Sequence, residues 1–510
     1  MEFEEKRKKQ YKLIEEDKST IIDSLNQSKV ALRSKKNNLK LIMKRKSKLE
    51  QIKSDFDNIK GDNQFHINNF ESSFNTIISF LNSSDKNLVN YCLNELCIYF
   101  KYNEPNLAEQ KMIVERQFFE ILLIIGNKFL YEKNESNLIL IIWILINIQI
   151  HNEGNDAYLS MIYNDIYFDF YNECYNKSGS DEIMNEIIIL LTYMTKIEND
   201  INIKILQSKV FDSIINCALN KNQDMDTMEM MIQLIANCLK ISNNYELHEN
   251  EINIINNCIT ILKNELINLG NDNIQKLCYE GLYKISKINN KYKFNEKLIK
   301  EEIPLQIMKL KLNNNNTTLL TALKIFGNIL TVSDKYCKII YEKNVIEFFN
   351  NILNKFDNDS KLVYIILNCI FNISVSKYRN IIKSSIIWTH EKIQKYFNMN
   401  DKIKIIFIKI VKYTIINGAL IFIYNTKVLE YLIYLLSNCN LIEKVSIKIL
   451  KIVDIYLKKF NNFEKENLEY YIIYNKFKDL FNSLEKIYKN NYINNDIIER
   501  IDKNIINNYQ

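Results

Sequence analysis

Catalysis and metal binding need histidines, cysteines or glycine-rich loops in particular arrangements, and this sequence provides few of them. Only four histidines are present among the 510 residues, and ten cysteines occur without a CxxC pair. No histidine has a recognisable nucleophile motif nearby, so no catalytic triad or zinc site is expected. The eight glycines stand alone, which excludes the glycine-rich phosphate loops of nucleotide-binding proteins. We therefore expect no enzymatic activity, no bound metal and no cofactor.

The composition predicts a large protein that is nearly all helical. Eight glycines and two prolines are too few for the many tight turns of a sandwich, barrel or propeller. Apolar residues make up 47% and charged residues 25%, as is usual for a chain that buries a core. Single cysteines lie within apolar helical patterns, which favours buried, reduced thiols in the cytosol or nucleus. Examples are Cys217, Cys238, Cys258, Cys278 and Cys369.

No segment predicts membrane insertion. The N-terminus begins with charged residues and lacks the apolar core of a signal peptide. The most hydrophobic stretch, Leu138 to Ile150, contains Asn147 and Gln149 and is too short to span a bilayer. It is better interpreted as a buried helix. The run from Asn313 to Asn316 is interpreted as a solvated loop between helices.

The positive charge is concentrated in an N-terminal tail. Residues 1–60 hold 17 basic and 10 acidic side chains, whereas the remaining 450 residues hold 50 basic and 51 acidic ones. Between Lys29 and Lys48 there are nine basic residues and no acid. Such a block indicates a solvated segment that meets an acidic partner, nucleic acid or a membrane surface. No aromatic residue is interleaved for base stacking, and the body is nearly neutral, so we expect no nucleic-acid partner.

Two recurring phrases share one period of about 44 residues. Two apolar residues followed by an acid begin at Phe118, Val210, Val345 and Val428, and a polar residue near the end of an apolar helix recurs at Asn147, Asn237, Asn328 and Asn372. This period is typical of armadillo and HEAT units, which stack into a continuous core. Pro304 falls where one of the helices would begin. We predict an all-α, right-handed superhelical solenoid of nine or ten armadillo repeats over residues 61–510, preceded by the basic tail 1–60.

Three segments resemble importin-α (karyopherin-α). Thr321–Thr331, with the sequence TALKIFGNILT, is similar to the ALRxxGNIVTG segment of that family. Ile141–Ile148 resembles its AAWALxNI helix, and Phe371–Ser374 is similar to its xSNIT segment one repeat after the GNI.

The two ends of the chain extend this resemblance. Val30–Lys36 and Leu41–Lys46 resemble the importin-β-binding region, whose pattern runs roughly VELRKxKRxxxLxKRRN, with a one-residue slip at the basic cluster. Residues 465–507 are similar to the atypical last repeat, including the helix entry Leu484–Tyr488. The resemblance thus covers essentially the whole chain in the expected order.

The resemblance implies a nuclear-import adaptor of the cytoplasm and nucleus. In that family, a Trp and an Asn four residues later face a concave groove from the third helix of successive repeats. A spacing of four places both side chains on one helix face. Indole faces can flank a cargo lysine through cation–π contacts, and the Asn carboxamide can hydrogen-bond the extended cargo backbone. The implied groove residues are Trp143, Asn147, Asn237, Asn328 and Asn372.

The sequence departs from the family pattern at most Trp positions. Only Trp143 and Asn147 form an intact pair. The following Trp positions hold Leu190, Gln233, Lys324 and Asn368, the position paired with Leu190 holds Met194, and a further unit would place Lys409 and Tyr413. The second tryptophan, Trp388, lies outside the register. The spaces between stacked indoles that grip a lysine would therefore be mostly missing.

The partners implied are an importin-β-like receptor, cargo proteins with Lys/Arg-rich localisation signals and, as a further candidate, a nuclear export receptor. The tail would bind importin-β, and its basic cluster could occupy the protein's own groove when the receptor is absent. The tail residues concerned are Leu32, Arg33, Lys35, Lys36, Lys44, Arg45 and Lys46. The alternative is an armadillo scaffold that kept the solenoid and lost signal recognition.

Overall fold

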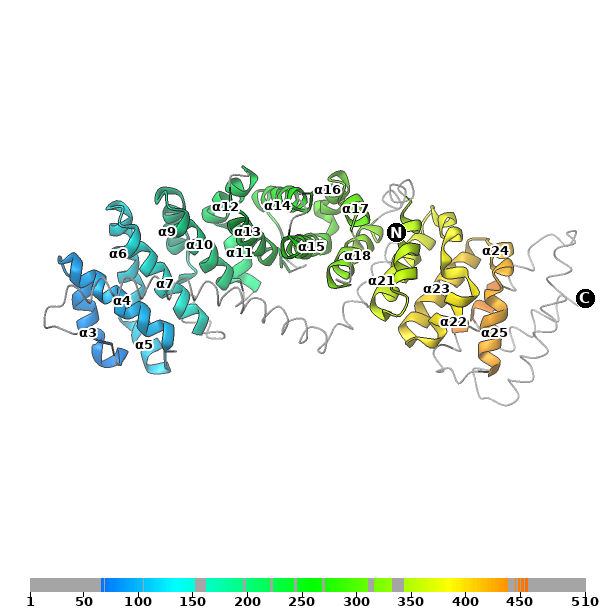
Figure 1. The fold of residues 1–510 in the computed structure, drawn as a ribbon, viewed down its shortest axis with the longest axis horizontal. Coiled ribbons are helices and arrows are strands. Elements are labelled where there is room, and N and C mark those ends of the chain that lie inside the picture. The colour runs from blue at the N-terminus through cyan, green and yellow to red at the C-terminus, as the bar shows by residue number, and fades with distance from the viewer. Residues whose placement is uncertain are drawn as a thin grey trace, which may run out of the picture. The chain divides into compact units, whose positions relative to one another are not determined.

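The protein is described here by a computed structural model. The structure describes residues 66–67, 69–103, 105–151, 162–195, 199–220, 223–242, 245–267, 271–310, 316–332 and 344–438, together with 445, 448–449, 451–453 and 455–456. The basic tail, with its predicted importin-β-binding residues, and the predicted last repeat lie outside the described residues. Within the described ranges every regular element is a helix (Figure 1), which confirms the all-α prediction.

The helices fall into two compact units, the first ending at Lys297 and the second beginning at Leu298. Helix α16 (Phe294–Lys300) contains this boundary. The first unit contains α3 (Phe70–Leu81), α4 (Lys86–Tyr102), α5 (Leu107–Glu115), α6 (Phe118–Tyr131), α7 (Glu135–His151), α9 (Asp165–Lys177), α10 (Asp181–Met194), α11 (Asn199–Gln207), α12 (Lys209–Leu219), α13 (Met225–Cys238), α14 (Glu249–Ile267), α15 (Asp272–Lys287) and the short η2 (Asn290–Tyr292). The second contains α17 (Ile303–Met308), α18 (Asn316–Leu330), α20 (Val345–Lys355), α21 (Ser360–Ser374), η3 (Arg379–Ser384), η4 (Ile386–Trp388), α22 (His390–Asn398), α23 (Asp401–Ile416), α24 (Leu420–Asn425) and α25 (Val428–Asn438).

Each unit is a stack of repeats. In the first unit α4, α7, α10, α13 and α15 pack side by side in chain order, and α6, α9, α12 and α14 form a second row against them (Figure 1). In the second unit α18, α21 and α23 pack in the same way. We call these helices, α4, α7, α10, α13, α15, α18, α21 and α23, the ladder helices, because the predicted groove residues lie on them. Stacking of neighbouring helical units confirms the solenoid.

Helix starts are marked by polar caps and by the phrase found in the sequence. Many helices begin after a residue whose side chain accepts a backbone N–H of the first turn, which satisfies an otherwise unpaired donor. These caps are Asn69, Asp85, Asn106, Asn164, Ser208, Asp224, Asn271, Asp359, Thr389 and Asn400. The abundant asparagine therefore has a structural use.

A tight turn precedes several second-row helices. Gln117, Asn344 and Lys427 have φ values of 53°, 61° and 53° and stand immediately before the two-apolar-plus-acid phrase. Glu302, with φ 58°, occupies the same place before α17, and Pro304 lies in the first turn of that helix, as predicted. At three of its four occurrences the recurring phrase therefore begins a helix after a left-handed residue. At the fourth, Val210, the helix begins instead after the side-chain cap Ser208.

Small residues allow close approach of helices in the first unit. A Cβ atom added at Gly281 of α15 would lie 2.9 Å from Leu262 Cδ1 and 3.6 Å from the Cα of Ala236 on α13. Glycine at this position therefore lets α15 approach α13 and α14 closely. None of the described helices combines the length and apolarity needed to cross a bilayer.

Candidate binding surface on the ladder helices

Trp143 lies inside the protein. Its side chain is 2% exposed, and every residue from Leu138 to Ile146 of α7 is buried. A helix that is apolar on all sides is expected to be enclosed by its neighbours. The expectation of a groove-facing indole is corrected here, because burial leaves no open π face at the surface for a cargo lysine.

The amide of Asn147 connects two repeats. Its Nδ2 donates to the backbone oxygen of Cys97 on α4, 50 residues earlier, at 3.3 Å. The side chain is partly exposed, unlike that of Trp143 on the same helix. The Asn147 amide, which was predicted to hydrogen-bond the cargo backbone, thus already uses its nitrogen within the protein.

Two of the other predicted asparagines, Asn237 and Asn372, also contact the preceding ladder helix. Asn237 Nδ2 of α13 donates to Thr195 Oγ1, at the end of α10, over 3.0 Å. Asn372 Nδ2 of α21 lies 3.5 Å from the backbone oxygen of Gly327 on α18 and is 1% exposed. Asn328 is 7% exposed. Asn328 and Asn372 are therefore buried and do not line an open surface.

We call the hydrogen bonds that join neighbouring ladder helices ties. Two further ties involve residues that the sequence did not predict. Lys284 Nζ of α15 donates to the backbone oxygen of Ala236 on α13 at 2.6 Å. Asn417 Nδ2, at the end of α23, donates to the backbone oxygen of Ser374 on α21 at 2.8 Å. Lys284 stands one period after Asn237, so the repeat spacing could have found it. No asparagine marks the position.

The three hydrogen bonds to Ala236, Gly327 and Ser374 share a physical reason. The last four carbonyl groups of a helix have no intrahelical partner. Ala236, Gly327 and Ser374 lie in the last turn of their helices, so the ladder residue of the next repeat supplies the missing donor. A lysine at this place also interacts favourably with the negative end of the helix dipole. In these three pairs the later helix thus supplies a donor to the end of the preceding one.

The opposite ends of the ladder helices are tied as well. Thr227 Oγ1 donates to Asn185 Oδ1 at 2.9 Å, and Asn271 Nδ2 donates to Glu229 Oε2 at 3.2 Å. In the second unit, Asn316 Nδ2 donates to a carboxylate oxygen of the α21 cap, Asp359, at 2.9 Å. Asn316 is the first residue of α18 and therefore not part of a loop, whereas Asn313–Asn315 of the predicted loop lie outside the described residues.

We expect loss of a tie to destabilise the stack. Asn237→Ala and Asn417→Ala should each lower the free energy of unfolding by about 1 kcal/mol, because the Thr195 hydroxyl and the Ser374 carbonyl would each lose a donor from the next repeat. Asn127→Ala is the matched control, since its amide bonds only Leu123 of its own helix, on an exposed face. Urea unfolding followed by circular dichroism measures the difference. Equal effects of all three substitutions would contradict the role of the ties.

Two buried amide oxygens on α21 have no hydrogen-bond partner. Asn368 and Asn372, four residues apart on one helix face, are each 1% exposed, and within the described structure neither Oδ1 accepts a hydrogen bond. Asn368 Nδ2 instead donates to Tyr364 O of its own helix at 2.7 Å. An unsatisfied buried acceptor is costly, so these atoms would gain from a donor brought by a ligand or solvent.

Three neighbouring ladder helices of the first unit carry only acidic charge. The sequences of α7, α10 and α13 contain no Lys or Arg. They contain six carboxylates, most of them in the first turns: Glu135, Asp181, Glu182, Glu186, Asp226 and Glu229. Acids at helix N-termini are stabilised by the helix dipole, which is a structural reason for their position. Glu186 is buried, and the other five carboxylates are exposed or partly exposed, so these three helices contribute negative charge to the surface.

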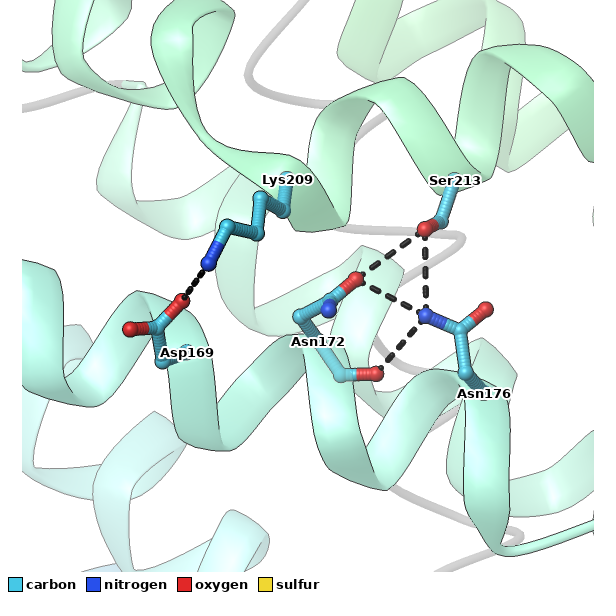
Figure 2. Close-up of polar contacts among 5 residues, drawn as sticks. All are labelled: Asp169, Asn172, Asn176, Lys209 and Ser213. Carbon is cyan, nitrogen blue, oxygen red and sulfur yellow. Dashed lines mark hydrogen bonds and ion pairs between the residues drawn. The ribbon is translucent and has the colours of Figure 1, made fainter.

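The second row has mixed charge and mutual contacts (Figure 2). Lys209 of α12 pairs with Asp169 of α9 at 3.2 Å, and Ser213 of α12 donates to Asn172 Oδ1 of α9 at 3.0 Å. Asn176 Nδ2 in turn donates to Ser213 Oγ at 3.1 Å. These contacts lie on solvent-exposed faces and hold adjacent repeats together. The second-row helices α9 and α12 thus carry charges of both signs, whereas α7, α10 and α13 carry carboxylates without Lys or Arg.

The described part of the chain offers little reactive chemistry. Among its residues, no group of three or more His, Cys, Asp and Glu side chains could hold a metal ion. The described cysteines are free thiols, and burial raises the pKa of Cys238, Cys258, Cys278 and Cys369 well above the usual range. A thiol kept protonated in this way is a poor nucleophile.

The fold and this surface define an all-α repeat solenoid, and comparison with solved structures agrees. The chain is similar to an engineered protein at 14% identity and a TM-score of 0.59, over 84% of this chain and 98% of that one. It is also similar to a designed armadillo repeat protein in complex with the peptide (KR)4 and to a computationally designed armadillo repeat protein for modular peptide recognition. These matches have 14% and 15% identity, TM-scores of 0.40 and 0.41, and each covers 50% of this chain and 98% of that one. No family model and no curated protein sequence matches the chain. Identities this low show the fold alone.

Proposed function

We propose that this protein is a non-enzymatic adaptor that binds an extended Lys/Arg-rich segment of another protein along α7, α10 and α13. The observation that carries this proposal is the presence of five exposed or partly exposed carboxylates, and no Lys or Arg, on three adjacent ladder helices. A surface of one charge sign steers a segment of the opposite sign and rejects like-charged partners.

In this proposal the peptide is recognised by its charge and by hydrogen bonds to its backbone. Tryptophan side chains that flank a lysine contribute little. Each exposed ion pair contributes about 0.2–1 kcal/mol, so several must act together. The tied amides of Asn147 and Asn237 use their nitrogen, and the carbonyl oxygen of the same group can accept a backbone N–H from a peptide. Affinity should therefore fall steeply as salt rises.

The resemblance to importin-α supports a role in nuclear import. The basic tail would bind an importin-β-like receptor, the adaptor would travel between cytoplasm and nucleus, and an export receptor would return it. Deleting residues 1–60 tests this part: binding of the receptor should be lost, and affinity for a basic peptide should rise if the tail competes for the same surface. Unchanged receptor binding and unchanged peptide affinity would reject the import role.

Peptide binding itself is tested by charge removal. The triple variant Glu135→Gln, Asp181→Asn and Asp226→Asn should weaken binding of a fluorescein-labelled Lys/Arg-rich peptide about tenfold, as read by fluorescence anisotropy. All three side chains are exposed, so little stability should be lost. The control removes the same charge from the second row through Asp169→Asn, Glu173→Gln and Asp212→Asn. Equal weakening in both variants would reject a specific site on the ladder helices.

The second candidate is a scaffold that has lost signal recognition. It is favoured by the burial of Trp143 and by the use of the asparagine amides between repeats. Under this alternative the basic peptide binds neither the full chain nor the chain lacking residues 1–60. That result would direct the search to a different class of partner.

A further inference from the structure

The outward face of α6 is apolar. Ile124 and Tyr131 are seven residues apart, and therefore on one side of the helix, and they are 68% and 91% exposed. Leu123 and Leu130 are partly exposed next to them, whereas the residues on the opposite side of α6 are buried. Single exposed apolar residues need no explanation, but a contiguous apolar surface indicates an interaction site. We call these four residues the α6 stripe.

Neighbouring helices of the second row are polar at the corresponding position. Ile124 stands four residues after Glu120, the acid of the two-apolar-plus-acid phrase. In α12 the residue four positions after the acid is Asn216, and in α9, where the phrase occupies Tyr167–Asp169, it is Glu173. Packing of the repeats therefore does not require an apolar residue here, and the α6 stripe needs a separate explanation.

A short segment of the N-terminal tail matches this stripe. We propose that the α6 stripe binds residues 49–59 of the same chain, which lie outside the described residues. In this segment Leu49, Ile52, Phe56 and Ile59 recur at spacings of three, four and three, the pattern of one side of an amphipathic helix. A helix this short is only marginally stable alone, so its apolar side needs a surface to pack against.

Charge also favours this pairing. Residues 49–59 contain three carboxylates and one lysine, in contrast to the basic block that precedes them. The exposed Lys128 lies within the α6 stripe, and the nearby Glu132 is already paired with Lys86 at 3.0 Å. Glu120 lies in the first turn of α6, where the helix dipole stabilises it. The segment therefore brings net negative charge to a stripe that contains a cation.

The segment is close enough to reach the stripe. α3 begins at Phe70, whose ring centroid lies 5.7 Å from that of Phe118 at the start of α6. The ten residues between Ile59 and Phe70 span up to about 33 Å when extended, whereas the 14 residues of α6 are about 20 Å long. A segment tethered at this distance has a high effective concentration, so a small apolar contact suffices for docking.

The size of the stripe suits one helix better than a second copy of the protein. A stable interface between two proteins takes about 20–30 residues from each side. The α6 stripe is one side of a single helix, which one further short helix can cover. Docking would fix the place where the basic block leaves the first unit, next to α6. This inference does not depend on the peptide surface proposed for α7, α10 and α13.

The test is hydrogen–deuterium exchange of the full chain, read by mass spectrometry on peptides that cover residues 49–59. In the parent chain these amides should be protected. Ile124→Ser together with Tyr131→Ser should speed their exchange about tenfold, because the docked helix loses its apolar partner. The matched control, Met225→Ser together with Ile267→Ser, removes two apolar side chains that are 54% and 49% exposed elsewhere in the first unit. Circular dichroism verifies that both variants remain folded.

Each result decides the proposal. Faster exchange of residues 49–59 in the α6 variant alone supports it. Unprotected amides in the parent chain, protection that survives loss of the stripe, or equal loss of protection in both variants overturns it. Sedimentation velocity tests for a second copy: a parent dimer that dissociates in the α6 variant would overturn the proposal in favour of self-association.

Discussion

The stability of the parent protein relative to a Lys284→Met variant is expected to rise with pH between about 8 and 10.5. Burial lowers the pKa of Lys284 from 10.5 to about 8 in the folded protein, with a smaller opposing effect of Glu280. In this window the unfolded chain still binds the proton and the folded chain has lost it. Stability contributed by this group therefore rises with pH, by about 2 kcal/mol after allowance for partial solvent screening.

The pH dependence of stability contributed by Lys284 is opposite in sign to that contributed by the other buried titratable groups. Burial raises the pKa of thiols and phenols such as Cys258 and Tyr279, so the unfolded state releases their protons first and stability falls at alkaline pH. These contributions are the same in both proteins and cancel in the comparison. The neutral amine can still donate to the Ala236 oxygen, so the tie persists when the charge is lost.

Urea unfolding at pH values between about 7 and 10 measures the difference. Lys287→Met, on the same helix, controls for removal of a lysine as such. A difference between parent and Lys284→Met that stays flat over this range, or that falls with pH, would contradict a buried ammonium at the end of α13.

Trp143→Ala is expected to destabilise the first unit by about 3–5 kcal/mol. The indole is 2% exposed in a helix whose other apolar residues are also buried, so truncation removes transfer free energy and leaves a cavity. Thermal unfolding followed by circular dichroism should show a large fall in the transition temperature of this unit. Trp143→Leu should cost much less, because it retains more of the apolar volume.

The leucine variant also separates packing from recognition. It removes the π face, so a cation–π cage would lose affinity for a Lys/Arg-rich peptide. Because the side chain is buried, we expect the affinity of the folded Trp143→Leu variant to match that of the parent. A severalfold loss of peptide affinity without loss of structure would show that the indole reaches a ligand.

Patterns within a repeat predicted the fold well. The all-α class, the period, the start of α17 near Pro304 and the buried helix around Leu138 to Ile150 follow from composition and local periodicity. These are properties of single helices and their caps. The predicted tail and the predicted last repeat lie outside the described residues and stay predictions.

The role of the ladder residues was harder to predict. The partners of Asn147 and Asn237 lie 50 and 42 residues away, and the acceptor of Asn147 is a backbone oxygen, which no residue type marks. The indole of Trp143 could be placed only once the neighbours on every side of α7 were known. Lys284 was missed because it replaces the expected asparagine.

The ties between repeats give the array a direction. At the last-turn ties, the later repeat supplies the donor and the earlier repeat supplies the helix-end carbonyl. Removing repeats from the C-terminal side would therefore expose acceptors of the helix that becomes terminal, and fraying would start there. Removing repeats from the N-terminal side leaves side-chain amides or an ammonium, which water solvates readily. Shortened forms of this protein should tolerate a new N-terminal end better than a new C-terminal end.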